Sequence, residues 1–160
     1  MSQDKAYWIS HKPCLYPYSD IEMLTLDDLI YYSKLIDQNI TVKRGFNTDG
    51  ASVPWLFQWK FKPFDNRTIR SVILHDYLYV LHDYDPTFTM DRKMADDILL
   101  ESLVAESWTN AKMYYDASMI FGGPLWQLKK PRTDVTEWIN IVKNGSELDL
   151  DNYISHIIHG

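Results

Sequence analysis

A carboxylate lies on the apolar face of the first long helix that the sequence predicts. Ile69, Val72, Ile73 and Val80 recur at the spacings of a helix face that packs on a core. Asp76 lies four residues after Val72 and four before Val80, so it falls on the same face. An unpaired carboxylate in an apolar core is costly, because it loses its hydration. Any fold of this chain must therefore bring a cation, a metal ion or several hydrogen-bond donors to Asp76.

A second predicted helix carries an aspartate in a similar position. Asp96 is followed by leucines at intervals of three, four and seven residues, so it points with them toward the core. The neighbouring Asp97 lines up instead with Lys93 and is expected to be solvated. Antiparallel packing of the two helices brings His75, which precedes Asp76, close to Asp96. A carboxylate on one imidazole nitrogen fixes the tautomer and frees the other nitrogen as a base, so we predict a hydrogen bond between His75 and Asp96.

The segments around these helices predict an α+β fold, a small β-hairpin followed by a helical bundle. The hairpin strands are Leu29–Ser33 and Asn39–Arg44, joined through KLIDQN. Helical patterns with capping residues follow to the end of the chain. The expected helices begin at a cap at Asp65 or Asn66 and run to about 81, then cover 90–106, 109–121, 133–143 and 148–158, and Gly122-Gly123-Pro124 is expected to end the third.

The chain is interpreted as one domain of residues 1–160, because it has no internal repeat and no linker. Residues 1–28 are expected to be irregular, since prolines interrupt any pattern there. Residues 29–63 hold the hairpin and a loop, Gly45–Pro54, and the aromatic segment after that loop is ambiguous. Residues 64–160 hold the helical part.

Composition excludes several functional classes. Sixteen Lys and Arg against 22 Asp and Glu leave a formal charge of −6, which disfavours nucleic acid as a partner. The single cysteine, Cys14, excludes an internal disulfide and every multi-cysteine zinc cage. The N-terminus does not resemble a signal peptide, and no stretch is long and apolar enough for a membrane span. We expect a reduced, intracellular protein.

The loop before the first helix could help to neutralise the buried charge of Asp76 by supplying further oxygen ligands for a cation. Asp76 can bind a hard cation through oxygen, completed by carboxylate and carbonyl oxygens from the loop segment TDGAS, residues 48–52. Gly50 lets the backbone approach a ligand closely. We predict that Asp49 lies near Asp76 with a cation or a basic side chain between them, and that Gly45 or Gly50 adopts a conformation that other residues avoid.

Structural explanations stay open for each of these residues. Asp49-Gly50 can be a simple turn. Ser52 lacks the Gly-x-Ser-x-Gly elbow of a nucleophile. Three arginines offer Asp96 a pairing without catalytic meaning: Arg92, Arg67 and Arg70. The other histidines have no ligand spacing and are assigned to the surface or the core: His11, His82, His156 and His159.

The chain resembles an uncharacterised family of bacteriophage and prophage domains. The resemblance rests on the string GF-x-TDGASVP at residues 45–54, on HDYLY at residues 75–79, and on Arg92 with Ala95-Asp96. It covers roughly residues 29–126. It implies a phage origin and no particular activity.

The spacing His75-Asp76-x-x-Tyr79, with Asp96 21 residues after the histidine, is similar to prokaryotic secreted phospholipase A2. That resemblance implies an antiparallel helix pair in which His75 activates water, Asp96 orients His75 and Tyr79 supports Asp96.

The same resemblance implies a calcium ion at Asp76, completed by Asp49 and the backbone of Gly50 and acting as a Lewis acid. Those phospholipases are secreted and disulfide-bonded, whereas this chain has one cysteine. The expected substrate is therefore an ester or an amide rather than a lipid in particular.

The leading hypothesis is a phage-encoded, divalent-metal-dependent hydrolase with His75 as its base, located in the host cytoplasm or the virion. Two non-enzymatic alternatives are a virion or tail-assembly protein that keeps the fold as a scaffold, and a protein that binds and blocks a host factor. A His-Asp phosphohydrolase is the weakest alternative, because only His11 precedes His75. A metal between Asp76 and the Asp49 loop favours the enzyme, and an arginine there favours the scaffold.

Overall fold

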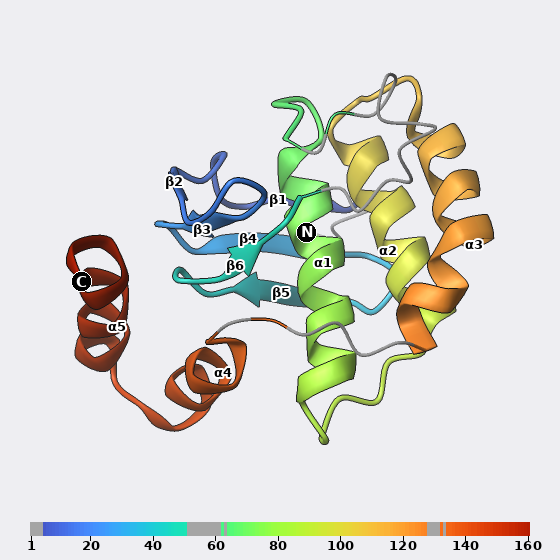
Figure 1. The fold of residues 1–160 in the computed structure, drawn as a ribbon. Helices are drawn as coiled ribbons and strands as arrows, with labels where there is room; N and C mark the ends of the chain where they lie inside the picture. Colours follow the sequence, from blue (N-terminus) through green and yellow to red (C-terminus); the bar gives the residue numbers. More distant parts are fainter. Residues whose placement is uncertain (1–4, 51–61, 63, 128–131, 133) are drawn as a thin grey trace.

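The computed structural model describes residues 5–50, 62, 64–127, 132 and 134–160. Within them the α+β class is confirmed, because small antiparallel sheets precede a series of helices (Figure 1). The strands are β1 (Tyr7–Trp8), β2 (Leu15–Pro17), β3 (Met23–Thr25), β4 (Leu29–Ser33), β5 (Gln38–Val42) and β6 (Asn47–Thr48). The helices are α1 (Ile69–Tyr84), α2 (Arg92–Ala105), α3 (Ala111–Gln127), α4 (Val135–Asn144) and α5 (Glu147–His159).

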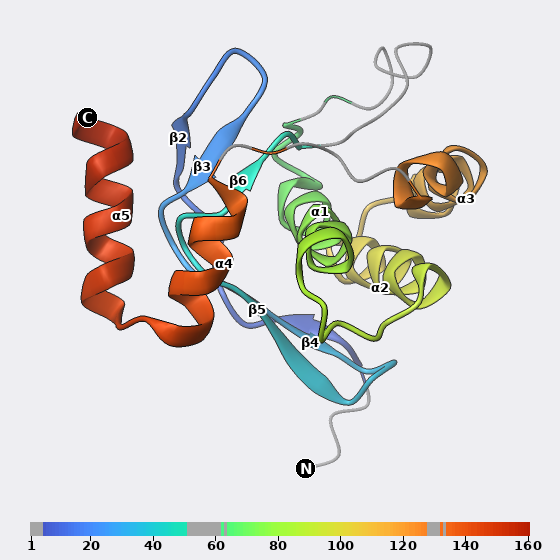
Figure 2. The ribbon, with the colours of Figure 1, turned by 60° about the horizontal axis from the view of Figure 1, so that its bottom comes forward.

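The strands form two antiparallel sheets, in the orders β1-β4-β5 and β2-β3-β6. The predicted hairpin is confirmed as β4 and β5, in a register that pairs Leu29 with Val42 and Ser33 with Gln38. In both ribbon views α3 lies on one side of the strands and α5 on the other (Figures 1 and 2). The residues Val72, Ile73 and Val80, which belong to the apolar stripe of α1, are buried in the core.

The expectation of an irregular N-terminal segment was wrong. β1 pairs with β4, with Tyr7 opposite Tyr32, and β3 pairs with both β2 and β6. The loop expected at Gly45–Pro54 likewise contains β6, while its residues 51–54 lie outside the described residues. These strands are two or three residues long, too short to show an alternating pattern in the sequence. β1 and β6 pair with strands that are distant along the chain, whereas β2 pairs with the nearby β3.

Helix boundaries also differ from the prediction. α1 begins after Thr68 rather than at Asp65 or Asn66, and it continues to Tyr84. α2 begins after Asp91, whose side chain accepts a hydrogen bond from the Met94 amide, so the expected start at residue 90 was wrong. α4 begins after Asp134, and residue 133, where this helix was expected to begin, lies outside the described residues.

The third helix does not stop at its glycines. α3 runs through Gly122, Gly123 and Pro124 to Gln127. A Cβ atom on Gly122 would lie 2.8 Å from the hydroxyl of Tyr79, so the glycine allows α3 to pack closely on α1. Tertiary packing here outweighs the weak helix propensity of glycine.

Glu101 of α2 holds the turn of the β4–β5 hairpin. Its carboxylate accepts hydrogen bonds from the Ser33 hydroxyl at 2.7 Å and the Tyr31 hydroxyl at 3.0 Å. It also accepts from the amides of Lys34 and Leu35, at 2.9 and 3.0 Å. These contacts fix the first sheet against α2, the helix that carries Asp96.

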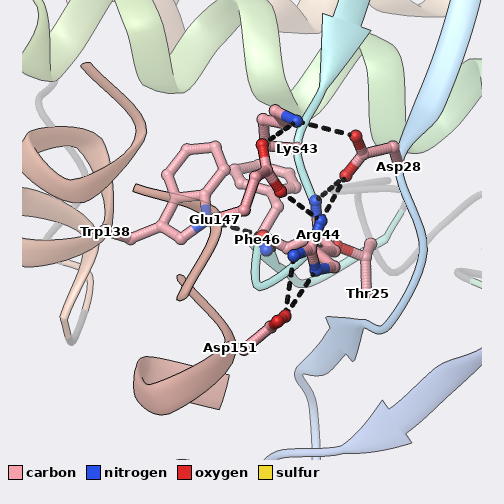
Figure 3. Close-up of polar contacts among 8 residues, drawn as sticks. All are labelled: Thr25, Asp28, Lys43, Arg44, Phe46, Trp138, Glu147 and Asp151. Atoms are coloured by element: carbon pink, nitrogen blue, oxygen red, sulfur yellow. Dashed lines mark hydrogen bonds and ion pairs between the residues drawn. The ribbon is translucent and has the colours of Figure 1, made fainter. Parts of the chain in front are cut away.

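An ion-pair network ties α5 to the strands (Figure 3). Glu147 pairs with both Lys43 and Arg44 at 2.7 Å, and Asp151 pairs with Arg44 at 2.7 Å. Beneath it, the indole of Trp138 donates to the Arg44 carbonyl at 3.0 Å. Because Glu147 and Asp151 are largely exposed, the network orients α5 more than it stabilises the fold.

Gly45, which follows Arg44, packs against α4 and α5 and has a φ of +84°. A Cβ atom there would lie 3.1 Å from Ile154 and 3.2 Å from Trp138. Gly45→Ala should therefore lower the free energy of unfolding by about 1–3 kcal/mol, from backbone strain and overpacking together. Chemical denaturation measures the change, and a midpoint identical to that of the wild type would contradict it.

Within the described part of the chain, no helix is both long and apolar enough to cross a membrane.

Candidate functional site

His75 and Asp96 form the predicted pair between α1 and α2. Nε2 of His75 lies 2.7 Å from Oδ1 of Asp96. The same oxygen accepts a hydrogen bond from the Tyr79 hydroxyl at 2.9 Å. Tyr79 lies one turn after His75, with the two rings 4.4 Å apart, so one face of α1 presents both groups to α2.

The pair is held from its buried side. The Asp96 side chain is 0% exposed, and the guanidinium Nε of Arg92 lies 3.3 Å from its second oxygen. Arg92 also donates to the carbonyls of Ser118 and Met119, which ties α3 to the same point. Arg92 is thus the one of the three suggested arginines that lies at Asp96, since Arg70 pairs with Glu106 and Arg67 with Asp65.

The protonation of Tyr79 follows from its position. Burial, followed by the charge of Asp96, raises the pKa of Tyr79 well above its usual value. Its hydroxyl therefore remains a donor to Asp96 at neutral pH. Trp126 packs edge-on against Tyr79 at 4.8 Å and stacks on His82 at 3.9 Å, so the end of α3 covers this face of α1.

His75 is placed to use its second nitrogen. When Nε2 donates to Asp96, Nδ1 carries the lone pair of a base. The side chain of His75 is 16% exposed, and Nδ1 has no hydrogen-bond partner among the residues that the structure describes. A pocket of about 340 Å³ lies on the other side of Asp96, and its lining does not include His75: it is formed by Asp91, Arg92, Lys93, Asp96 and Met119.

Asp97 is less solvated than expected. It forms an ion pair with Lys93, as its spacing predicts, and it also accepts a hydrogen bond from the Tyr115 hydroxyl at 2.7 Å. Asp97 therefore links α2 to α3 and does not lie at His75.

A second group of the predicted site residues lies around Asp76, whose side chain is 8% exposed. The Thr48 hydroxyl donates to its Oδ2 at 2.8 Å. The guanidinium of Arg132 reaches both carboxylate oxygens, with the Nη1 contact at 3.1 Å. Asp49 Oδ1 lies 3.5 Å from Nη2 of the same guanidinium. Asp49 and Asp76 thus approach each other with a basic side chain between them, as predicted.

The calcium site implied by the phospholipase resemblance does not fit this arrangement. Both oxygens of Asp76 are engaged by Arg132, whose guanidinium takes the place of a cation between the two carboxylates. The described residues also contain no group of three or more His, Cys, Asp or Glu side chains suited to a metal. Gly50 has the expected positive φ, +70°, and its amide donates to the Thr48 hydroxyl at 3.1 Å, so it shapes the turn at this site.

Arg132 is the residue that sequence reasoning missed. It is separated from Asp76 by 56 residues and belongs to no helix or strand, so no periodicity connects the two. The available signal was the carboxylate of Asp76 on the apolar stripe, which required a cation, a metal ion or several hydrogen-bond donors but did not identify the residue that supplies them. Ser52, the other candidate in the loop, lies outside the described residues, and the four remaining histidines are exposed.

Comparison with protein families gives a match over residues 24–117, to a family described as "Protein of unknown function (DUF1353)". The chain belongs to the DUF1353 family. The matched residues include β3 from Leu24 onward, β4 to β6 and all of α1 and α2, and therefore His75 and Asp96. Arg132, α4 and α5 lie outside the match. No curated protein and no solved structure matches the chain.

Proposed function

We propose that this DUF1353 chain is a phage-encoded hydrolase of esters or amides in which His75 is the general base. The observation that carries the proposal is the 2.7 Å contact of His75 Nε2 with Asp96, reinforced by Tyr79 on the same oxygen. A buried carboxylate hydrogen-bonded to one imidazole nitrogen fixes the tautomer and orientation of a catalytic histidine.

In the proposed reaction, Nδ1 of His75 accepts a proton from water while the water oxygen attacks the carbonyl carbon of the substrate. The Asp96 carboxylate stabilises the imidazolium that forms, and Tyr79 and Arg92 keep that carboxylate in place. The imidazolium then returns its proton to the leaving group as the bond to the carbonyl carbon breaks. Because Arg132 occupies the space between Asp49 and Asp76, this sequence of steps includes no metal.

The position of Arg132 supports a second candidate function. An arginine in the place of the expected cation supports a protein that retains the fold as a scaffold, in a virion or against a host factor. The acidic net charge and the exposed apolar side chains on α3, among them Ile120, are compatible with a protein partner.

Activity assays separate the two candidates. The wild type should be screened on phospholipids, other esters, peptidoglycan fragments and cyclic nucleotides, with a chelator and then with calcium, magnesium, manganese or zinc. The hydrolase proposal expects turnover of an ester or amide that persists in the chelator. It also predicts that Asp96→Asn loses most of its turnover, because the asparagine side chain holds His75 in the wrong tautomer. Turnover unchanged in Asp96→Asn would contradict it, and inactivity on every substrate would favour the scaffold.

A further inference from the structure

A helical turn without side chains lies against the groups that hold Asp96. Gly122 of α3 is buried, and a Cβ atom on it would lie 2.8 Å from the Tyr79 hydroxyl. A Cβ atom on Gly123 would lie 3.1 Å from Nη1 of Arg92. Both separations are shorter than a van der Waals contact, so a side chain at either glycine would displace the group that it meets.

Arg92 is bound to the same turn of α3. Its Nη2 donates to the Met119 carbonyl at 2.6 Å and to the Ser118 carbonyl at 3.3 Å. These carbonyls precede the two glycines by four residues, so the guanidinium lies along the surface that side chains at the glycines would cover. The bare turn therefore lets Arg92 bind α3 while its Nε stays 3.3 Å from Asp96.

The Tyr79 hydroxyl has little room to move aside. Its ring packs on the ring of His75 at 4.4 Å and on that of Trp126 at 4.8 Å. The hydroxyl donates to Oδ1 of Asp96, the same oxygen that contacts Nε2 of His75. A side chain at Gly122 would therefore move the hydroxyl away from Asp96 and change the acceptor that orients His75.

We propose that Gly122 and Gly123 are positioning residues of the His75 site. Because they lack a Cβ atom, α3 keeps a hydroxyl at one oxygen of Asp96 and a guanidinium at the other. This role rests on the proposed function for its effect on turnover, whereas its effect on the pair is measurable without a substrate. It also explains why two glycines occupy the interior of a helix, where alanine is more favourable.

The direction of the stability change in the full chain is the first test. Gly122→Ala should lower the melting temperature, whereas glycine to alanine at an unconstrained helix position raises it. In a Tyr79→Phe background the same substitution should raise the melting temperature, because the atom that the new Cβ would meet is gone. If Gly122→Ala fails to fold, the double variant must fold, and its failure would count against the role of Gly122.

The ¹H–¹⁵N NMR signal of the His75 ring at neutral pH, assigned by its absence in His75→Ala, reports on the pair itself. Loss of the Tyr79 donor makes Oδ1 of Asp96 a stronger acceptor, so the Nε2 proton should move downfield in Gly122→Ala. Tyr79→Phe should give a similar shift, and the double variant should shift no further.

Two further variants of α3 set the scale of that shift. Gly123→Ala meets the end of a flexible guanidinium, so its effect on the His75 signal should be smaller than that of Gly122→Ala. Ile120→Ala changes an exposed side chain of the same helix and should leave the signal in place.

Kinetics on a substrate from the screen complete the test. Gly122→Ala should lower kcat roughly tenfold or more with KM unchanged, which corresponds to one hydrogen bond to a charged group. A folded Gly122→Ala with the wild-type His75 signal, a raised melting temperature or a wild-type kcat would overturn the role. A wild type without turnover would count against the proposed function alone, since the melting and NMR results still decide what the glycines do.

Discussion

Under the proposed hydrolase function, replacing His75 with alanine is expected to lower ester or amide turnover by roughly 10²–10⁴-fold, the usual contribution of a general base. The fold should survive, because the His75 side chain is partly exposed and Asp96 keeps its contacts with Tyr79 and Arg92. Steady-state kinetics on the substrate found in the screen, with circular dichroism of the same samples, measure both effects. The loss should appear in kcat, since the base acts on the reacting water rather than on substrate binding.

His82→Ala is the matched control for that prediction. His82 lies on the same helix and also contacts an aromatic ring, Trp126, but it makes no contact with Asp96. Its removal should leave kcat within about twofold of the wild-type value, because it removes no group near the reacting water. Equal rates for the wild type and His75→Ala would instead exclude His75 as the base and leave the pair with Asp96 a structural one.

Asp76→Ala is expected to lower the free energy of unfolding by about 3–5 kcal/mol. Among the described residues, the substitution leaves Asp49 as the one carboxylate at ion-pair distance from the buried Arg132 guanidinium, and it removes the acceptor of the Thr48 hydroxyl. A charge buried without its partner is far more costly than the pair was favourable. Urea denaturation at neutral pH gives the change directly.

A second ion pair in the same protein provides the comparison. Asp116 pairs with Lys112 on α3, where the two side chains are 50% and 80% exposed. Asp116→Ala should change stability by less than about 1 kcal/mol, because exposed pairs are screened by water and salt. If the two substitutions had equal effects, the burial of the Asp76–Arg132 pair would not control its energy.

The double variant Asp76→Ala with Arg132→Ala separates charge from packing. The double variant should lower the free energy of unfolding by less than the sum of the two single variants, because neither charge is then buried without the other. Additive costs would show that the two residues act independently.

Helical periodicity accounts for what was predictable at the His75 site. A spacing of four residues places His75 and Tyr79 on one face of α1, and the leucines after Asp96 direct that carboxylate into the core. Two helices joined by a short connection must pack as neighbours, so the contact between His75 and Asp96 followed from local pattern and chain connectivity.

The strands of the N-terminal segment and the length of α3 were not predictable in this way. Tyr7 and Trp8 become a strand only because β4 lies beside them, and a two-residue strand has no alternation to detect. Gly122 and Gly123 are ordinary helix stops in isolation, yet in the folded chain they lie against Tyr79 and Arg92. Side-chain contacts between α3, α1 and α2 outweigh the local cost of glycine in a helix.

The sequence by itself determined that Asp76 is buried and that a cation, a metal ion or several hydrogen-bond donors must reach it, because apolar residues one turn before and after it commit that face of α1 to the core. Only the tertiary structure decided which of these it is. Arg132 comes from a segment outside every helix and strand, 56 residues away, and its guanidinium enters the site through contacts with Asn47, Asp49 and Tyr84 that no local spacing encodes. A burial requirement is a property of one helix, whereas the partner that satisfies it depends on how distant segments meet in the folded chain.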